Sequence, residues 1–108
     1  MKLLTKEILA AFKKQGDTAD KYSKDIKIIA KFFNPCGRET WYATEYDAKT
    51  KMFYGFVSVS DVYRDEPGSF SLKELRNIRL PCGLKIERDK FFETGKYTLK
   101  DIIKGKRP

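Results

Sequence analysis

Residues 40–59 read TWYATEYDAKTKMFYGFVSV, and this stretch decides the fold. Two runs rich in aromatic and β-branched residues, 40–46 and 52–59, flank a short polar loop, and such residues favour strands. Tyr42 and Tyr46 stand four positions apart, so strand alternation predicts that they share one face of a sheet. A connection this short joins antiparallel neighbours. The stretch therefore predicts two adjacent strands of an antiparallel sheet.

A third strand is predicted on the N-terminal side, over residues 26–33, where isoleucine and phenylalanine dominate. Alternation gives this strand an apolar face and a lysine face, formed by Ile26, Ile28, Ala30 and Phe32 against Lys27 and Lys31. Residues 34–37 (Asn-Pro-Cys-Gly) are a strong turn signal that links it to strand 40–46. The three strands are thus expected to form an antiparallel meander.

Apolar residues at helical spacing predict an amphipathic helix over residues 5–15, with Thr5 as its N-cap and Gly16 at its end. Ser71 and Glu74 have the spacing of a capping box, which predicts a short helix at 72–79. The same pattern recurs at Thr98–Asp101, before a last helical turn. The sequence thus predicts two short helices in the C-terminal half of the chain.

The fold class that follows is α+β. We expect one domain over residues 1–104: an antiparallel meander sheet of about four strands with an N-terminal helix and one or two short helices. The fourth strand is predicted at 84–88, and residues 61–68, which end in Pro-Gly, are predicted to be an exposed loop. Residues 105–108 are predicted to be a disordered tail.

Several chemistries are excluded by composition. The chain has no histidine, which removes the commonest general base and the Ser-His-Asp and Cys-His arrangements. Its two cysteines cannot form a closed zinc site without further ligands, and no glycine-rich phosphate loop is present. We therefore expect no catalytic residues, no metal and no cofactor. Cys36 and Cys82 are predicted to be reduced, partly buried thiols, because a disulfide would require their two loops to meet.

No apolar run reaches the roughly 18 residues that a membrane span needs. The first residues carry charges too early for a signal peptide. The sequence thus predicts a soluble cytoplasmic protein without a membrane partner, and a monomer is assumed.

The net charge of +8 is uneven along the chain. Residues 1–31 hold eight basic and four acidic residues, residues 95–108 hold five and one, and residues 32–94 hold ten of each. Chain ends often lie close together, so the two basic ends are expected to form one surface that attracts phosphate backbones or acidic proteins. The alternative is that these lysines serve solubility alone.

Aromatic residues on neighbouring strands offer platforms for nucleic-acid bases, while lysine and arginine hold phosphates. The candidate nucleic-acid-binding residues are Lys27, Lys31, Arg38, Tyr42, Tyr46, Tyr54, Lys96, Lys100 and Lys104. The competing interpretation is that the rings build the core of a small sheet.

A lysine-assisted or paired-carboxylate mechanism stays open, and two pairs of carboxylates are the best candidates for acid–base or metal chemistry. They are Glu45 with Asp47 and Glu87 with Asp89. The alternative is that each carboxylate makes a structural ion pair or fixes a strand end.

Several segments, in order along the chain, together resemble the domain-of-unknown-function 2958 family. These segments are MKLLTKE (1–7), AKFFNP (30–35), TWYATEYD (40–47), FYGFV (53–57), GSFSLKEL (68–75) and GLKIERD (83–89). The resemblance implies a small protein of plasmids, integrative elements and phages, encoded near anti-restriction and DNA-processing genes. It carries no assigned activity.

Three functions are consistent with these features. The first is a non-catalytic protein of a mobile element that contacts nucleic acid, or a nucleoprotein complex, through its basic terminal segments. The second is an anti-restriction or anti-CRISPR inhibitor that binds a host nucleoprotein defence complex by protein–protein contacts. The third is a small carboxylate- or lysine-dependent enzyme.

Overall fold

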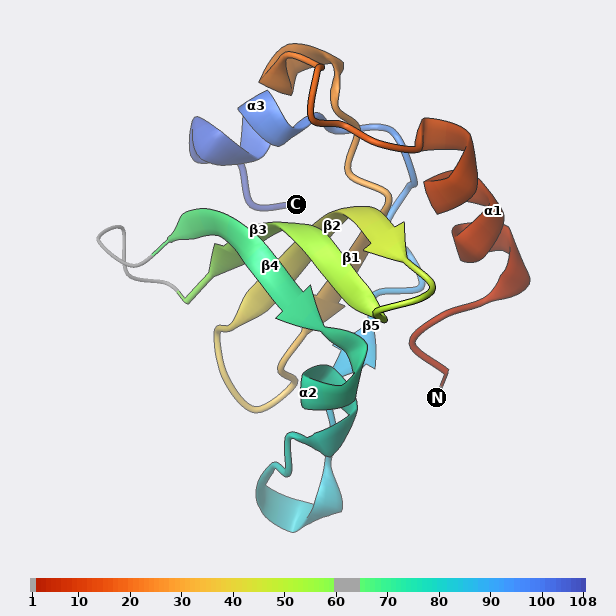
Figure 1. Ribbon diagram of the computed structural model, residues 1–108. Coiled ribbons are helices and arrows are strands. Elements are labelled where there is room, and N and C mark those ends of the chain that lie inside the picture. Colours follow the sequence, from red (N-terminus) through yellow and green to blue (C-terminus); the bar gives the residue numbers. More distant parts are fainter. Residues whose placement is uncertain (1, 60–64) are drawn as a thin grey trace.

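The computed structural model describes residues 2–59 and 65–108, in which five antiparallel strands form one sheet (Figure 1). The strand order is β4-β3-β2-β1-β5. The strands are β1 Ala30–Phe33, β2 Thr40–Asp47, β3 Met52–Ser58, β4 Glu66–Ser71 and β5 Glu87–Arg88. The helices are α1 Lys6–Gln15, α2 Leu72–Asn77 and α3 Leu99–Ile103, with 3₁₀ turns at Ser23–Asp25 and Pro81–Gly83. The predicted α+β class and antiparallel sheet are confirmed, with five strands in place of about four.

The helices begin where the capping signals predict. The Thr5 hydroxyl accepts a hydrogen bond from the Ile8 amide (3.2 Å), and the helix ends at Gly16, whose φ of 65° suits glycine. Ser71 accepts from the Glu74 amide at 2.8 Å. At α3 both halves of the capping box form, because Thr98 and Asp101 each accept the backbone N–H of the other.

Strand β4 corrects the prediction of a loop at 61–68. Residues 61–64 lie outside the described part of the chain, but Glu66–Ser71 pairs with β3 along its whole length. Pro67 is accommodated because β4 is an edge strand, where a missing N–H breaks no ladder on the outer side. Turn-forming residues therefore do not exclude an edge strand.

The predicted strand at 26–33 is also shorter than expected, since only Ala30–Phe33 forms β1. Its first half pairs with the C-terminal segment instead. The Ile28 amide donates to the Tyr97 carbonyl (2.9 Å), and the Leu99 amide donates to the Ile26 carbonyl (2.8 Å). As a result Ile28 and Ile29 are both buried, and the expected alternation breaks between them.

A β-bulge in β2 changes which face its side chains occupy. The register between β2 and β3 shifts between Ala43 and Glu45, which leaves Thr44 as an extra, fully buried residue. The Thr44 hydroxyl donates to the Tyr54 carbonyl at 3.0 Å. Because of this extra residue, Tyr42 and Tyr46 lie on opposite faces of the sheet, and the prediction that they share a face is wrong.

Each face of the sheet has its own apolar cluster. The larger cluster joins the sheet to α1 and α2 and centres on Phe53, whose ring packs within 6 Å of four other rings. The smaller cluster joins the sheet to α3, and its members include Ile28, Tyr42, Phe56 and Ile102. Most of the aromatic residues of the sheet thus build the core.

Candidate nucleic-acid interface

Tyr42 is the first predicted base-stacking residue that the structure corrects. Its side chain is only 1% exposed, and its hydroxyl donates a hydrogen bond to the Pro108 carbonyl at 3.3 Å. Burial raises the pKa of Tyr42 to about 12. A ring covered by α3 and the C-terminal residues cannot stack on a base.

Tyr46 and Tyr54 do not form a stacking row either. Tyr46 packs in the larger cluster, with its ring centroid 4.8 Å from that of Phe53 and 6.0 Å from that of Phe12. Tyr54 is 45% exposed and lies on the opposite face of the sheet. Of the three predicted tyrosines, Tyr42 is therefore buried, Tyr46 is half-buried and Tyr54 is exposed.

The two basic ends do lie side by side in part. Lys27 pairs with Thr98 in an isolated β-bridge, and Lys24 and Lys100 line one shallow depression with Tyr22. These segments also carry exposed acids (Asp17, Asp20, Asp25 and Glu93), however. Lys96 is 3.8 Å from Glu93, and Lys106 is 3.9 Å from Asp101. Lys104 is exposed. The charge of this surface is thus mixed.

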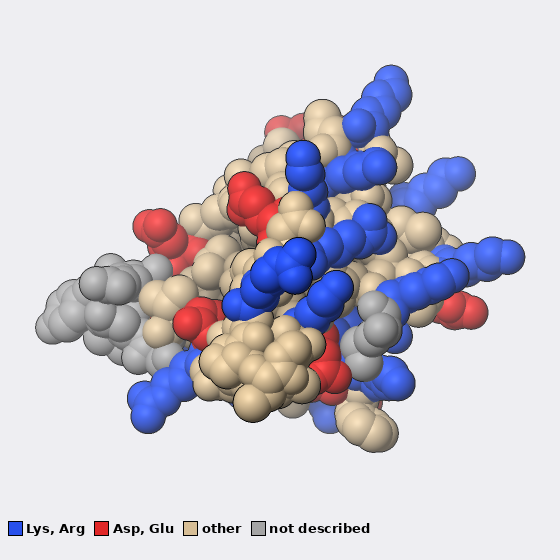
Figure 2. Space-filling model, turned by 90° about the horizontal axis from the view of Figure 1, so that it is seen from below, with Lys and Arg blue, Asp and Glu red and all other residues tan. Residues whose placement is uncertain are grey.

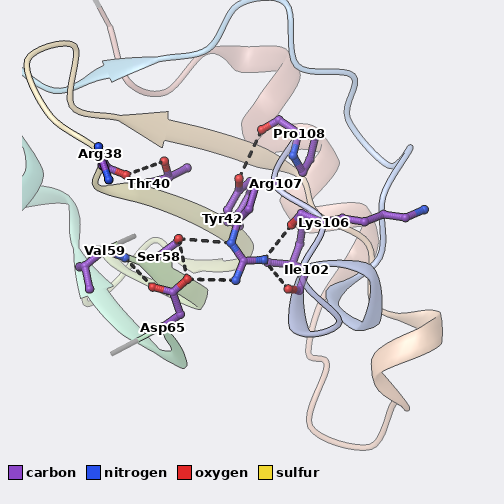
Figure 3. Close-up of polar contacts among 10 residues, drawn as sticks. All are labelled: Arg38, Thr40, Tyr42, Ser58, Val59, Asp65, Ile102, Lys106, Arg107 and Pro108. Atoms are coloured by element: carbon purple, nitrogen blue, oxygen red, sulfur yellow. Dashed lines mark hydrogen bonds and ion pairs between the residues drawn. The ribbon is translucent and has the colours of Figure 1, made fainter. Parts of the chain in front are cut away.

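Lys31 and Arg38 meet on the sheet face that carries Tyr42. They line a pocket of about 400 Å³ that also includes Arg107. Figure 3 shows Arg38, Tyr42 and Arg107 of this pocket. Lys31 forms an ion pair with Asp89 at 3.4 Å, whereas Arg38 is exposed in the loop between β1 and β2. Three predicted site residues, Lys31, Arg38 and Tyr42, therefore share this pocket.

The C-terminal residues 105–108 form one wall of that pocket, which differs from the disordered tail that we predicted. Arg107 is held by an ion pair with Asp65 (3.0 Å) and by donation to the Ile102 carbonyl (2.5 Å) (Figure 3). Its guanidinium also lies over the ring of Phe56. Burial alone would raise the pKa of Asp65, but hydrogen bonds from Arg107, Val59 and Ser58 lower it overall. The contacts of Arg107 thus hold residues 105–108 against the sheet and α3.

The high pKa of Tyr42 predicts alkaline destabilisation. Between about pH 10 and pH 12 the unfolded chain loses a phenol proton that the folded protein keeps, so stability falls as pH rises. At about pH 11.5 this costs roughly 2 kcal/mol relative to pH 9. Urea unfolding of wild type and Tyr42→Phe at both pH values measures the effect. Tyr42→Phe should lose less stability between the two than wild type does.

Tyr54→Phe is the matched control, because its ring is accessible to water. It should lose as much stability as wild type over the same interval. Equal pH dependence of wild type, Tyr42→Phe and Tyr54→Phe would contradict the assignment to Tyr42.

The carboxylates of the first pair, Glu45 and Asp47, both accept hydrogen bonds from loop residues. Glu45 accepts hydrogen bonds from the amide and the hydroxyl of Thr18. Asp47 accepts from the Lys49 amide (2.9 Å) and the Thr50 amide, and these bonds lower the pKa of Asp47. Both carboxylates thus stabilise loops at the ends of β2.

The second pair is divided between two sites. Asp89 forms the ion pair with Lys31 and accepts from the Phe91 amide at 2.9 Å, whereas Glu87 lines a separate cleft. Within the described residues, no group of three or more acidic or cysteine side chains is arranged to hold a metal ion. Cys36 and Cys82 are free thiols and both are exposed, so the expectation that they are partly buried is wrong.

Lysine and arginine side chains also gather on another side of the molecule (Figure 2). Figure 2 shows the molecule of Figure 1 from below, which is the side where α2 lies. The lysine and arginine side chains gather on this side. We define the basic face as the exposed residues Lys2, Arg76, Arg79 and Lys85. Among the described residues, no carboxylate lies within ion-pair distance of Arg76, Arg79 or Lys85.

Long-range contacts assemble the basic face. The Arg88 guanidinium donates to the Lys2 carbonyl at 2.6 Å and so fixes the N-terminal segment beside β5. The Leu80 amide donates to the Leu84 carbonyl (3.1 Å), which brings Arg79 and Lys85 next to each other. The face therefore combines Lys2 from the N-terminal segment with residues 76–85, which are distant from it in sequence.

A cleft opens in the basic face. Its volume is about 640 Å³, and it lies between the N-terminal segment, α2 and the segment before β5. Leu3, Leu75 and Ile86 are buried along its floor, whereas Leu84 is 43% exposed at its side. The polar side chains that line it are Arg76, Asn77, Lys85 and Glu87. The cleft thus combines apolar lining residues with a polar rim that holds two basic residues and one acidic residue.

The sequence does contain the excess of basic residues that forms this face, but counting charges over the whole of residues 32–94 conceals it. Residues 32–94 are neutral as a whole, yet residues 72–90 hold six basic and three acidic residues, which gives +3. A window matched to one helix and the segment after it would have located this excess.

Comparison with known proteins gives one match that spans most of the chain. A family model described as "Protein of unknown function (DUF2958)" matches residues 3–104. No curated protein and no solved structure matches the chain. Within the described residues, no helix is long and apolar enough to cross a membrane.

Proposed function

Because the chain belongs to the DUF2958 family of proteins of unknown function, we propose its function from its own residues: it is a non-catalytic protein that binds nucleic acid on its basic face. The family match confirms the resemblance noted in the sequence. The partner is free nucleic acid or the nucleic-acid part of a host nucleoprotein complex, as the resemblance to proteins of plasmids, integrative elements and phages implies.

The observation that carries this proposal is that the basic side chains of the face are exposed and that three of them have no acidic partner among the described residues. Arg76, Arg79 and Lys85 are exposed and have no carboxylate within ion-pair distance in the described part of the chain. Basic groups in this state release counterions when they meet phosphates, which is the main source of affinity for nucleic acid. By contrast, Lys31 and Lys96 from the predicted set already pair with acids.

The state of the carboxylates supports binding over catalysis. Glu45, Asp47 and Asp89 accept hydrogen bonds or ion pairs that organise loops and strand ends. A general acid or base must instead be free to contact a substrate proton. The enzyme hypothesis therefore has little support from the geometry of the described residues.

Reversing two charges of the basic face should weaken binding. We expect Arg76→Glu with Lys85→Glu to lower affinity for a labelled oligonucleotide by about tenfold or more. The slope of log K against log salt should fall by roughly 1.4 to 1.8, the value for two lost phosphate contacts. Fluorescence anisotropy at low and moderate salt, with DNA and RNA probes, measures both quantities.

The matched control reverses the charges of Lys96 and Lys100 instead, by Lys96→Glu with Lys100→Glu. Both variants then lower the net charge of +8 by the same amount. This control should bind within about threefold of wild type. Equal weakening by both variants would show that net charge alone governs binding. Absence of binding by wild type at low salt would overturn the proposal. Co-purification with a host protein complex without any affinity for free nucleic acid would instead favour the inhibitor hypothesis.

A further inference from the structure

We propose that the cleft in the basic face receives an unpaired base, so that this protein selects single-stranded nucleic acid over duplex. This inference rests on the proposed function and names its substrate class. The cleft volume of about 640 Å³ lies within the range of roughly 300 to 1,000 Å³ that is usual for sites that bury small ligands. A nucleobase is therefore small enough to enter it.

The apolar lining of the cleft suits the flat faces of a base. Leu84 offers the accessible apolar surface, since it is 43% exposed, whereas Leu3, Leu75 and Ile86 also line the cleft but are almost fully buried. The Arg76 guanidinium also lines the cleft, and guanidinium planes stack on bases in single-stranded recognition. An apolar surface and a planar cation thus meet at one place.

The polar lining of the cleft suits the edge of a base. The side-chain amide of Asn77 offers both donors and an acceptor, and the carboxylate of Glu87 accepts hydrogen bonds from exocyclic amino groups. Glu87 also argues against an acidic peptide as the occupant, because two carboxylates in one cleft would repel each other. Lys2 and Lys85 are exposed beside these groups and are available to the flanking phosphates.

A duplex cannot use the cleft without rearrangement. Its bases are stacked on each other, and their faces become accessible only when a nucleotide is flipped out, which carries a free-energy cost. Duplex would therefore contact only the rim, whereas a single strand would contact the rim and the apolar lining. The difference in affinity between the two forms reports the contribution of the cleft.

The test compares a labelled single strand of about 12 nucleotides with the duplex of the same length, by fluorescence anisotropy in the same salt. Wild type should bind the single strand about tenfold tighter or more. Leu84→Ala, which removes the accessible apolar side of the cleft and changes no charge, should reduce that ratio to roughly threefold or less. Its affinity for duplex should not change.

Leu9→Ala is the matched control, because Leu9 is 40% exposed on α1 and Leu84 is 43% exposed. It should leave both affinities unchanged, and far-ultraviolet circular dichroism of each variant verifies the fold.

Equal binding of single strand and duplex by wild type would overturn the inference while the proposed function stands. A Leu84→Ala variant that keeps the full preference would also overturn it. Binding of neither probe would remove both proposals. Tighter Leu84-dependent binding of a glutamate- and leucine-rich peptide would assign the cleft to a protein partner.

Discussion

Phe53→Ala is expected to cost about 3 to 5 kcal/mol of folding free energy, the largest loss that we predict for a single substitution. Phe53 is 1% exposed, and its ring centroid lies 4.8 to 5.9 Å from those of Phe12, Phe32, Tyr46 and Phe70. Removing the ring leaves a cavity between the sheet and α1 that four other rings cannot fill without repacking. Small domains are stable by only about 5 to 15 kcal/mol, so the midpoint of urea unfolding should fall by about a fifth or more.

Phe91→Ala provides the control for this result. Phe91 is 94% exposed, so the same chemical change there should alter stability by no more than about 0.5 kcal/mol. If Phe53→Ala unfolds at the same urea concentration as wild type, the aromatic cluster is not the centre of the core.

Gly55→Ala is expected to be the second largest effect, with a loss of about 3 kcal/mol. A Cβ atom on Gly55 would lie 1.9 Å from the Tyr42 carbonyl oxygen and 3.1 Å from the Ala43 Cα. Both neighbours are backbone atoms of the paired strand β2, so no side-chain rotation can relieve the overlap. The strands must separate next to the bulge, where the hydrogen-bond ladder is already interrupted.

Gly68→Ala is a matched control because Gly68 pairs directly with Gly55 in β4, yet nothing lies within 4 Å of its added Cβ. This variant should be neutral or more stable by roughly 0.5 kcal/mol, since alanine loses less chain entropy on folding than glycine. Urea unfolding of both variants provides the comparison. Equal effects would mean that the approach of β2 to Gly55 is not what requires glycine.

The arrangement of charge changes how the basic composition is interpreted. The two Lys-rich ends meet through the pairing of residues 26–28 with 97–99, but they bring their own acids with them. The basic face instead gathers Lys2 and three cations of residues 76–85 around one cleft. The paired charge reversals at Arg76 with Lys85 and at Lys96 with Lys100 therefore separate two surfaces that a statement of net charge cannot distinguish.

The elements that the sequence predicted correctly depend on neighbours in the chain. Thr5, Ser71 and Thr98 cap helices because each hydroxyl reaches an amide three residues further on. The hairpin of β2 and β3 follows from two β-forming runs joined by a short polar loop. Such interactions are local, so residue type and spacing are enough to predict them.

Tertiary structure alone decided the burial of Tyr42, the pairing of β4 and the position of Arg107. The bulge at Thr44 places Tyr42 and Tyr46 on opposite faces, and the partner of Arg107 is an aspartate far away in the chain. The basic face also depends on the fold, because the hydrogen bond from Arg88 to the Lys2 carbonyl holds Lys2 beside β5. Hydrogen-bond pairing between distant segments fixes which side chains are covered and which charges gather. The sequence determines the charge of each residue, but the electrostatic potential of a surface depends on distances in the folded chain.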